Sequence, residues 1–222
     1  FAPLRDDIIF VGDNGGAIRW KGQNLFTSEM SPEGWRALNR LTREQGDIAV
    51  LCGLESAYVE RPFAVHDAVL RHFYTKIEYV DRLEDVTAPA DKFTIYLPQH
   101  NAQQAYDTVY ASQRSIYSVA VAGECWVDIM NPGVHKGAAL QTLGQLWGLP
   151  SESMMAFGDT YNDAEMLQTV RYGFLMENGS EPLRQKVPFL APSHREAGVM
   201  QVLHRVLAQN GCVCPEDFVP AH

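Results

Sequence analysis

The sequence predicts an α/β fold in which a core with a parallel sheet carries a smaller, inserted α+β domain. From about residue 128 onward, short and solidly apolar segments alternate with helical patterns, which is typical of buried parallel strands. Between residues 28 and 127, helical patterns precede strands that alternate apolar and polar residues, which indicates a sheet with one open face. The 222 residues, 46% of them apolar, suffice to bury a core in one larger domain or two small ones.

The first expected element is a strand within residues 6–16, a short apolar run that Asn14 and Gly15 close as a tight turn before a returning strand. A helix is expected next, because Ser31 is a suitable N-cap and is followed by proline at the first helical position. Gly46 is the expected stop of this helix. The change of pattern near residue 28 marks the start of the insert.

The rest of the insert contains strands and helices in turn. Val65, Val69 and Phe73 recur at helical spacing and predict one helix face. The run at residues 92–98 alternates cleanly, which predicts a half-exposed strand. In chain order, the sequence predicts strands at residues 47–53 and 56–60, a helix at 62–74, a strand at 92–98, a helix at 101–113, and two strands that form a hairpin around Gly123-Glu124.

The last part of the chain alternates helices with apolar strands. Gly173 is the expected stop of the helix that follows the acidic loop, and residues 212–222 are expected to be an irregular extension. The last long helix is expected to place five apolar side chains on one face: Val199, Val202, Leu203, Val206 and Leu207. The expected elements are helices at residues 135–148, 163–173, 180–187 and 195–211, and strands at 153–159, 174–178 and 188–192.

Composition restricts the partners. The formal net charge is −9 and the pI is about 5.2, so the surface repels phosphate backbones and nucleic acid is not expected as a partner. No apolar run reaches the length of a membrane span, and no signal peptide begins the chain, so no membrane partner is expected. The four cysteines lack Cys-x-x-Cys spacing and are expected to be ordinary thiols in a reducing cytoplasm, the alternatives being a metal site or a disulfide in the tail.

The stretch at residues 156–167, AFGDTYNDAEML, carries the chemistry. Asp159 and Asp163 follow a buried strand at its carboxyl end, where open parallel sheets bind ligands. Two crowded carboxylates at such a position suit Mg²⁺, and Asn162 can donate its amide to a phosphate oxygen. Gly158 allows the backbone to approach a ligand. The alternative is that the two aspartates cap the helix that starts at Ala164.

Lys136 begins the helix that precedes this strand. A lysine there opposes the helix dipole unless an anion compensates it, and helix N-termini themselves attract phosphate. Lys136 is therefore a candidate phosphate-binding and catalytic residue, the alternative being a solvated lysine. His135 beside it is given no catalytic role.

These motifs resemble the haloacid dehalogenase superfamily. HKGAAL, FGDTYNDAEML and MENGSEPLRQKV are similar to its third and fourth motifs, and the match is best with the Cof-type sugar-phosphate phosphatases. The segments DIIFVGDNGGAI and VDIMNPGVHKG are similar to that group as well. The resemblance runs from about residue 6 to 207 and implies a Rossmann-like core plus an inserted cap. It places residues 1–27 and 128–222 in the core and residues 28–127 in the cap.

The resemblance also implies roles for individual residues. Asp159 binds Mg²⁺, Asp163 supports that site from behind, Lys136 steadies the nucleophile and the phosphoryl oxygens, and Asn162 contacts the phosphate. The family's nucleophile is an aspartate in an Asp-x-Asp motif, and this chain contains no such motif. The nucleophile is therefore expected upstream of Phe1.

The expected reaction is Mg²⁺-dependent hydrolysis of a small phosphate monoester, a phosphorylated sugar or related metabolite, by a cytoplasmic monomer or homodimer. The alternatives are a non-catalytic phosphate-binding module and, against the strand-rich cap, a phosphomutase. Glu55 and Ser56 could read sugar hydroxyls or form an ordinary turn. Tyr161 is bulky for the family and His194 replaces a usual asparagine.

Overall fold

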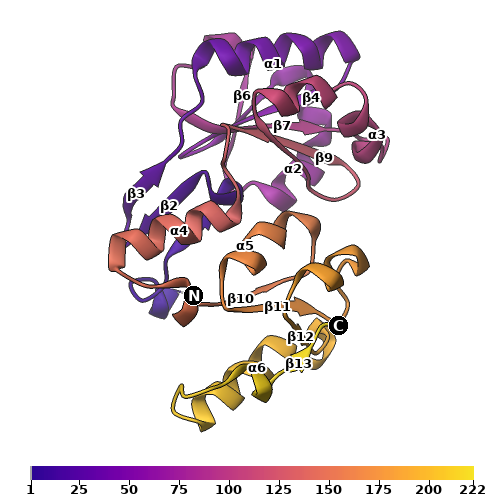
Figure 1. Ribbon diagram of the computed structural model, residues 1–222. Coiled ribbons are helices and arrows are strands. Elements are labelled where there is room, and N and C mark those ends of the chain that lie inside the picture. The colour runs from indigo at the N-terminus through magenta and orange to yellow at the C-terminus, as the bar shows by residue number, and fades with distance from the viewer. Residues whose placement is uncertain (1) are drawn as a thin grey trace. The chain divides into compact units, whose positions relative to one another are not determined.

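The computed structural model describes residues 2–222, which divide into two compact units, one up to Val134 and one formed by His135–His222 (Figure 1). Each unit has its own sheet and its own buried clusters. Both combine helices with strands, and the second unit contains the parallel strands, so the predicted fold class is confirmed. The assignment of residues 1–27 and 128–222 to a core and of 28–127 to a cap stays a prediction.

The first unit begins with a small antiparallel sheet. The predicted turn at Asn14 and Gly15 lies between its first two strands, and both residues have positive φ angles. The third strand was not predicted, because its exposed polar residues give no apolar run. The strands are β1 (Phe10–Gly12), β2 (Ala17–Trp20) and β3 (Gln23–Thr27).

The main sheet of the first unit has the strand order β6-β5-β4-β7-β9-β8. All neighbours are antiparallel except β5 and β6, which are parallel. The predicted strands and the hairpin are confirmed, and β6 is an addition to them. The strands are β4 (Ile48–Gly53), β5 (Ala57–Glu60), β6 (Ile77–Val80), β7 (Ala90–Tyr96), β8 (Ser118–Val121) and β9 (Trp126–Met130).

Helices cover both faces of this sheet. Leu51 and its neighbours pack on one face with α1, whereas Val50 packs on the opposite face with Leu70 of α2, and Figure 1 shows the two helices on opposite sides. The predicted open face is therefore wrong, since alternate residues of β4 and β7 are buried on both sides. The helices are α1 (Pro32–Gln45), α2 (Asp67–Phe73) and α3 (Ala102–Asp107).

The ends of α1 follow the sequence signals, whereas the next helix differs from its prediction. The Ser31 hydroxyl accepts a hydrogen bond from the Gly34 amide, and Gly46 ends the helix with φ 76°. Residues 62–74 instead form a 3₁₀ helix, Arg61–His66, followed by the short α2. The change of helix type breaks the expected apolar face, so the three side chains on it are exposed: Val65, Val69 and Phe73.

The second unit is built on a four-stranded sheet with the order β10-β11-β12-β13. Its first three strands are parallel, as the solidly apolar segments predicted, and β13 is antiparallel to β12. Among the described strands, β10 pairs with β11 alone and forms one edge. The elements are α4 (Lys136–Trp147), β10 (Met155–Gly158), α5 (Ala164–Thr169), β11 (Tyr172–Met176), β12 (Phe189–Ala191), α6 (Gly198–Ala208) and β13 (Val219–Pro220).

Both faces of this sheet are buried. Leu175 packs on one face with Leu167 of α5, and Phe174 packs on the other with Val202 of α6. Leu207 departs from the predicted apolar face of α6, because it is 71% exposed. Neighbouring strands buried on both faces are what the continuous apolar segments predicted.

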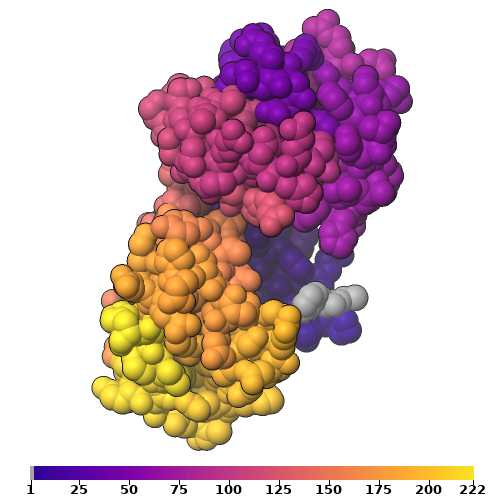
Figure 2. Space-filling model, turned by 90° about the vertical axis from the view of Figure 1, so that its right-hand side faces the viewer, coloured from indigo at the N-terminus to yellow at the C-terminus, as the bar shows by residue number. Residues whose placement is uncertain are grey.

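Two predictions in this unit are wrong. The C-terminal tail, yellow in Figure 2, is not irregular throughout, because β13 joins the sheet and Phe218 is buried. The helix after the acidic loop does not stop at Gly173, because α5 already ends at Thr169. Gly173 lies within β11, where a Cβ would meet the Leu167 carbonyl oxygen at 2.0 Å, so this glycine serves close packing rather than a helix end.

Candidate active site

The acidic loop of the second unit leads from β10 into α5. Gly158 is the last residue of the strand, and a 3₁₀ turn, Tyr161–Asp163, precedes the helix. A Cβ at Gly158 would lie 2.5 Å from the Cβ of Asp163, so only glycine lets the loop fold back this closely. The loop therefore returns to the end of its own strand within five residues.

Asp163 is the centre of the loop's hydrogen bonds. Its Oδ2 accepts from the backbone amides of Asp159 at 2.9 Å and Thr160 at 3.0 Å, and from the Thr160 hydroxyl at 3.3 Å. Its Oδ1 accepts from the Lys136 Nζ at 2.5 Å. The pattern is a capping box between Thr160 and Asp163. The helix-cap interpretation thus holds for Asp163, and an ion pair is added to it.

The Asp163 carboxyl is held in its ionised form. Its side chain is only 6% exposed, and this burial alone would raise its pKa. The hydrogen bond from Lys136 and those from the loop amides outweigh burial, so the pKa of Asp163 lies below its usual value. Asp163 therefore carries a negative charge at neutral pH and keeps both of its oxygens engaged.

Lys136 is placed by the start of α4. His135 caps this helix through its Nδ1, which accepts from the Ala138 amide at 3.2 Å. A Cβ at Gly137 would lie 2.7 Å from the Glu165 carbonyl oxygen, so α4 packs tightly against α5 at this point. The anion that compensates Lys136 in the described chain is Asp163.

Asp159 differs from Asp163 in its environment. Its backbone is fixed from two sides, since its amide donates to Asp163 and its carbonyl accepts from the Ser180 amide at 2.8 Å. Its carboxylate is exposed, and no partner for it lies within residues 2–222. The loop thus presents one free carboxylate on a rigid backbone, next to the ion pair of Lys136 and Asp163.

Asn162 lies between these groups. Its Oδ1 accepts from the Thr160 hydroxyl at 2.7 Å and is 3.4 Å from the Lys136 Nζ. Because the Oδ1 of Asn162 faces Thr160 and Lys136, its amide nitrogen, which is the donor, points away from them. All four predicted site residues of the second unit, Lys136, Asp159, Asn162 and Asp163, therefore belong to one connected group. Thr160 was missed, although the Thr-x-x-Asp spacing is a capping-box signal.

The donor set suits a metal ion only in part. Mg²⁺ prefers one or two carboxylates together with water and phosphate oxygens. Asp159 offers a free carboxylate of this kind, whereas the oxygens of Asp163 already accept from Lys136 and the loop amides. Within residues 2–222, no three or more His, Cys, Asp or Glu side chains lie together as a complete metal site. One protein ligand fits, and further ligands would have to come from elsewhere.

The remaining singled-out residues lie in different surroundings. The Tyr161 ring is 54% exposed, and its hydroxyl accepts from the Lys186 Nζ at 3.1 Å. His194 donates its backbone amide to Asn178 at 2.9 Å and begins a short 3₁₀ turn. Neither contact assigns a catalytic role to Tyr161 or His194.

Glu55 and Ser56 are already paired. The Glu55 carboxylate lies 2.6 Å from the Arg19 guanidinium, and the Ser56 hydroxyl donates to Glu78 at 2.7 Å. A buried charged cluster in the same unit was missed, and it lines a cavity together with Glu55 and Ser56. Its members are Asp13, Lys92 and Asp128.

Two further features of the chain are simpler. The four cysteines are free, with Cys52 buried and Cys212 and Cys214 exposed. Within residues 2–222, no helix has the length and apolar character that a membrane span requires.

The sequence of this chain is similar to a known family of hydrolases and to named phosphatases. A family model described as haloacid dehalogenase-like hydrolase matches residues 1–203. The Escherichia coli K12 protein 5-amino-6-(5-phospho-D-ribitylamino)uracil phosphatase YbjI is 30% identical over 210 residues, which cover 93% of this chain and 77% of that protein. An HMP-PP phosphatase of E. coli ATCC 8739 is 45% identical over 69 residues, which cover 31% of this chain and 27% of that protein.

Solved structures share the fold. SMU.1108c from Streptococcus mutans UA159 has a TM-score of 0.85 at 26% identity, over 94% of this chain and 80% of that one. BT4131, described as a subclass IIB sugar phosphatase, has a TM-score of 0.78 at 17% identity, over 92% of this chain and 78% of that one.

Proposed function

Because this chain belongs to the haloacid dehalogenase-like hydrolase family and is a phosphatase, we propose that it hydrolyses small phosphate monoesters with the help of Mg²⁺. The membership confirms the resemblance to the Cof-type phosphatases and the predicted enzyme class. The observation that supports the proposal most is the free Asp159 carboxylate, held on a fixed backbone beside the Lys136–Asp163 ion pair. The Asp159 carboxylate can bind a cation, and the Lys136 ammonium can bind an anion. Asp163 contacts both residues, so their charges match those of a Mg²⁺ ion and a phosphate side by side.

In this proposal each residue of the loop has one task. Asp159 would hold the Mg²⁺ ion, which supplies positive charge against the phosphate oxygens. Asp163 fixes the Asp159 amide and the Lys136 ammonium and does not touch the substrate. Lys136 donates to a phosphoryl oxygen, and the Asn162 amide donates to another. Lys136 can do this while bound to Asp163, because an ammonium has three protons.

The attacking group is proposed to be an aspartate that lies upstream of this chain. A strand added in parallel to the free edge of β10 would end beside Asp159, where phosphorus must sit. The aspartate attacks phosphorus and forms an aspartyl-phosphate, while a second carboxyl protonates the leaving alkoxide and then activates water. Lys136 and Asn162 would bind and orient the phosphate for both steps.

The proposed substrates are phosphorylated sugars and related metabolites. The similar E. coli protein is named for a phosphorylated ribitylamino-uracil, and BT4131 is described as a sugar phosphatase. The protein is proposed to act on them in the cytoplasm, as a monomer or homodimer. A non-catalytic phosphate-binding module is the alternative.

The test compares phosphate release by the protein carrying its upstream segment with and without Mg²⁺, on a panel of sugar phosphates. Wild type is expected to release phosphate only with Mg²⁺, and Asp159→Asn to lose about 100-fold or more of this activity. Glu165→Gln, an exposed acid on α5, is the matched control and should keep it. Full Mg²⁺-dependent activity of Asp159→Asn would refute the metal assignment, and no release by wild type from any substrate would favour the binding module.

A further inference from the structure

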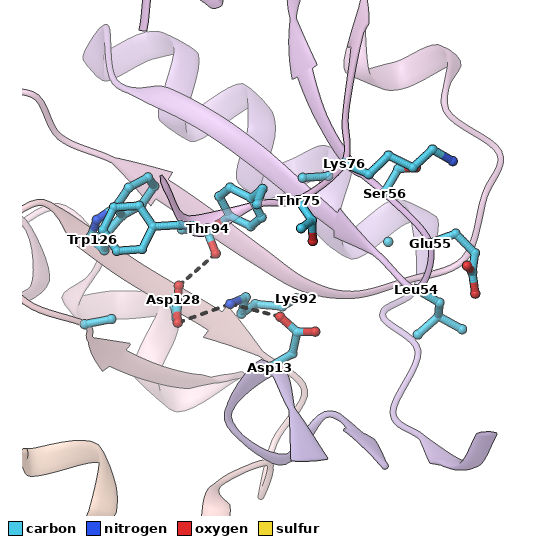
Figure 3. A pocket seen from close by; sticks show the side chains of 15 residues that line it. Asp13, Leu54, Glu55, Ser56, Thr75, Lys76, Lys92, Thr94, Trp126 and Asp128 are labelled. Atoms are coloured by element: carbon cyan, nitrogen blue, oxygen red, sulfur yellow. Dashed lines mark hydrogen bonds and ion pairs between the residues drawn. The ribbon is translucent and has the colours of Figure 1, made fainter. Parts of the chain in front are cut away.

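A cavity of about 460 Å³ lies in the first unit, at the end of the main sheet where β4 begins and β7 ends. The charged cluster of Asp13, Lys92 and Asp128 lies near the opposite end of these two strands and lines a different cavity (Figure 3). The two cavities share no lining residue. The volume of the first is within the range of small-molecule sites, so it is a separate candidate site.

Asp47 supplies the negative charge of this cavity. It is the one acid among the described residues of the lining, and no lysine or arginine is among them. Its Oδ2 accepts from the Tyr110 hydroxyl at 2.9 Å, whereas its Oδ1 has no hydrogen bond or ion pair within residues 2–222. Burial raises the pKa of the Asp47 carboxyl, and the hydrogen bond from Tyr110 offsets this only in part. The half-buried carboxylate therefore lacks a compensating cation.

Helix α1 adds to the negative potential. Its last residue, Gln45, lines the cavity, and Asp47 follows it two positions later. The C-terminal end of a helix carries a partial negative charge, so a carboxylate there is destabilising unless a cation lies nearby. Arg43, the basic residue of the last turn, is paired with Glu60 instead. The helix end and the carboxylate thus both favour a cation in the cavity.

Asn101 is a second acceptor without a donor. Its side chain lines the cavity, and its Oδ1 is buried with no hydrogen-bond partner within residues 2–222. Asn101 is also the N-cap residue of α3, where an asparagine oxygen ordinarily accepts from a helix amide, but it makes no such bond. Buried acceptors of this kind are uncommon and costly. The oxygen needs a donor that the described chain does not supply.

Apolar side chains form another part of the lining. Phe63, Leu97 and Val109 belong to it, of which Leu97 is buried and the other two are half-buried. Hydrocarbon surface beside a small number of polar groups is the usual construction of small-molecule sites. The cavity therefore suits a molecule with one polar end and a short carbon chain.

We infer that this cavity binds a small primary amine in its ammonium form, with Asp47 and Asn101 as the acceptors of the charged group. The carbon chain of the amine packs against Phe63 and Val109. An ammonium group has three protons and no acceptor, so it can donate to both oxygens at once. An anion would be repelled by Asp47 and by the end of α1.

A metal ion fits this cavity less well than an organic cation. Hard divalent cations take several oxygen ligands, and Asp47 is the one acid among the described residues of the lining. Within residues 2–222, no group of three or more His, Cys, Asp or Glu side chains could hold a metal. The site is complete within the first unit, and the inference does not rest on the proposed phosphatase reaction.

The test is an NMR titration of the full chain with n-butylamine hydrochloride at constant pH, with 1-butanol and sodium butanoate as the neutral and anionic counterparts. The ring resonance of His66, which lines the cavity, is the readout, and His66→Gln assigns it by its disappearance. Butylammonium is expected to shift this resonance, 1-butanol to bind more weakly and butanoate not to bind. Asp47→Asn should weaken butylammonium binding about tenfold, because a hydrogen bond to a charged group is lost. Asparagine keeps an acceptor for the Tyr110 hydroxyl.

Asp107→Asn is the matched control, since Asp107 is an exposed acid of α3 outside the lining, and it should leave binding unchanged. If Asp47→Asn does not fold, Gln45→Lys tests the charge instead. Gln45 is exposed, and a lysine at a helix end is favourable, so its ammonium should compete with butylammonium and weaken binding.

Four results would overturn the inference. Butylammonium does not bind, its binding is equal in the cavity variants, 1-butanol or butanoate binds as tightly, or Mg²⁺ alone shifts the His66 resonance more than butylammonium does. Asp159→Asn should retain butylammonium binding, so failure of the phosphatase proposal is distinguishable.

Discussion

The Lys136 ammonium and the Asp163 carboxylate form an ion pair with an Nζ–Oδ1 distance of 2.5 Å, which joins the start of α4 to the acidic loop. Asp163 is almost fully buried and Lys136 is 30% exposed, so the pair lies at the boundary of the interior. Removing one partner of a buried ion pair destabilises a protein by more than the intact pair stabilises it, because the remaining charge stays buried without compensation. The order of the loop therefore depends on this contact.

We expect Lys136→Met to lower the free energy of unfolding by about 1–3 kcal/mol, because Asp163 is left with fewer donors. The pKa of Asp163 is lowered in the folded protein, so its contribution to stability is present above the unfolded pKa and is lost as the pH falls through the folded pKa. In Lys136→Met the folded pKa of Asp163 moves toward the unfolded value, so this acid-dependent loss of stability should be smaller. Urea unfolding between pH 3 and pH 7 measures both effects.

Lys136→Arg is the matched control, since it keeps the charge and should recover part of the stability. Equal stability and equal acid sensitivity of wild type and Lys136→Met would show that the ion pair contributes nothing to the loop.

We expect Gly158→Ala to destabilise the second unit by about 1–3 kcal/mol, because the new Cβ would lie 2.5 Å from the Cβ of Asp163. The displaced loop should also lose activity in the phosphate-release assay. Gly12→Ala is the control, because a Cβ there meets nothing within 4 Å and the residue has a negative φ angle. Thermal unfolding that is unchanged in Gly158→Ala would contradict the close return of the loop.

The third prediction concerns Asp91, a fully buried carboxyl whose two oxygens have no hydrogen-bond partner within residues 2–222. Burial, and then repulsion by Asp13, raise the pKa of Asp91 to about 7. Between its usual pKa and 7, the folded protein keeps a proton that the unfolded chain releases, so stability falls as the pH rises. We expect this loss to approach about 1.4 kcal/mol per pH unit within that window.

Asp91→Asn should remove that pH dependence, whatever its effect at a single pH. Unfolding in urea at pH 5 and pH 8 measures it, with Asp85→Asn, an exposed acid, as the control. The same pH dependence in wild type and Asp91→Asn would assign it to another group.

The acidic loop was predictable because its signals are local. An apolar strand, a glycine and two aspartates lie within one short stretch. The Thr-x-x-Asp spacing in the same stretch, which was missed, determines which backbone amides meet Asp163. Lys136 was predictable from the cost of a cation at a helix start, although its compensating anion in the described chain is a carboxylate of the protein itself. The metal and phosphate roles stay predictions.

The charged cluster was not predictable, because it depends on strand register. Thr94 of β7 and Asp128 of β9 are direct neighbours across the sheet, and no local pattern fixes that pairing. Lys92 was interpreted as lying on a half-exposed strand, and the covered second face of the sheet buries it instead. The exposure of Val65, Val69 and Phe73 was missed because the apolar spacing does not reveal the change from a 3₁₀ helix to α2 within this segment.

Within residues 2–222, every hydrogen bond to the Asp163 carboxylate comes from residues between Lys136 and Asp163, a stretch of chain that lies wholly in the second unit. Substitutions in the first unit therefore remove none of these contacts, and well-separated substitutions generally have additive effects. Such a division lets the first unit vary in evolution without loss of the contacts that order the acidic loop. For an engineer, it means that libraries directed at the first unit can be diversified without rebuilding the acidic loop.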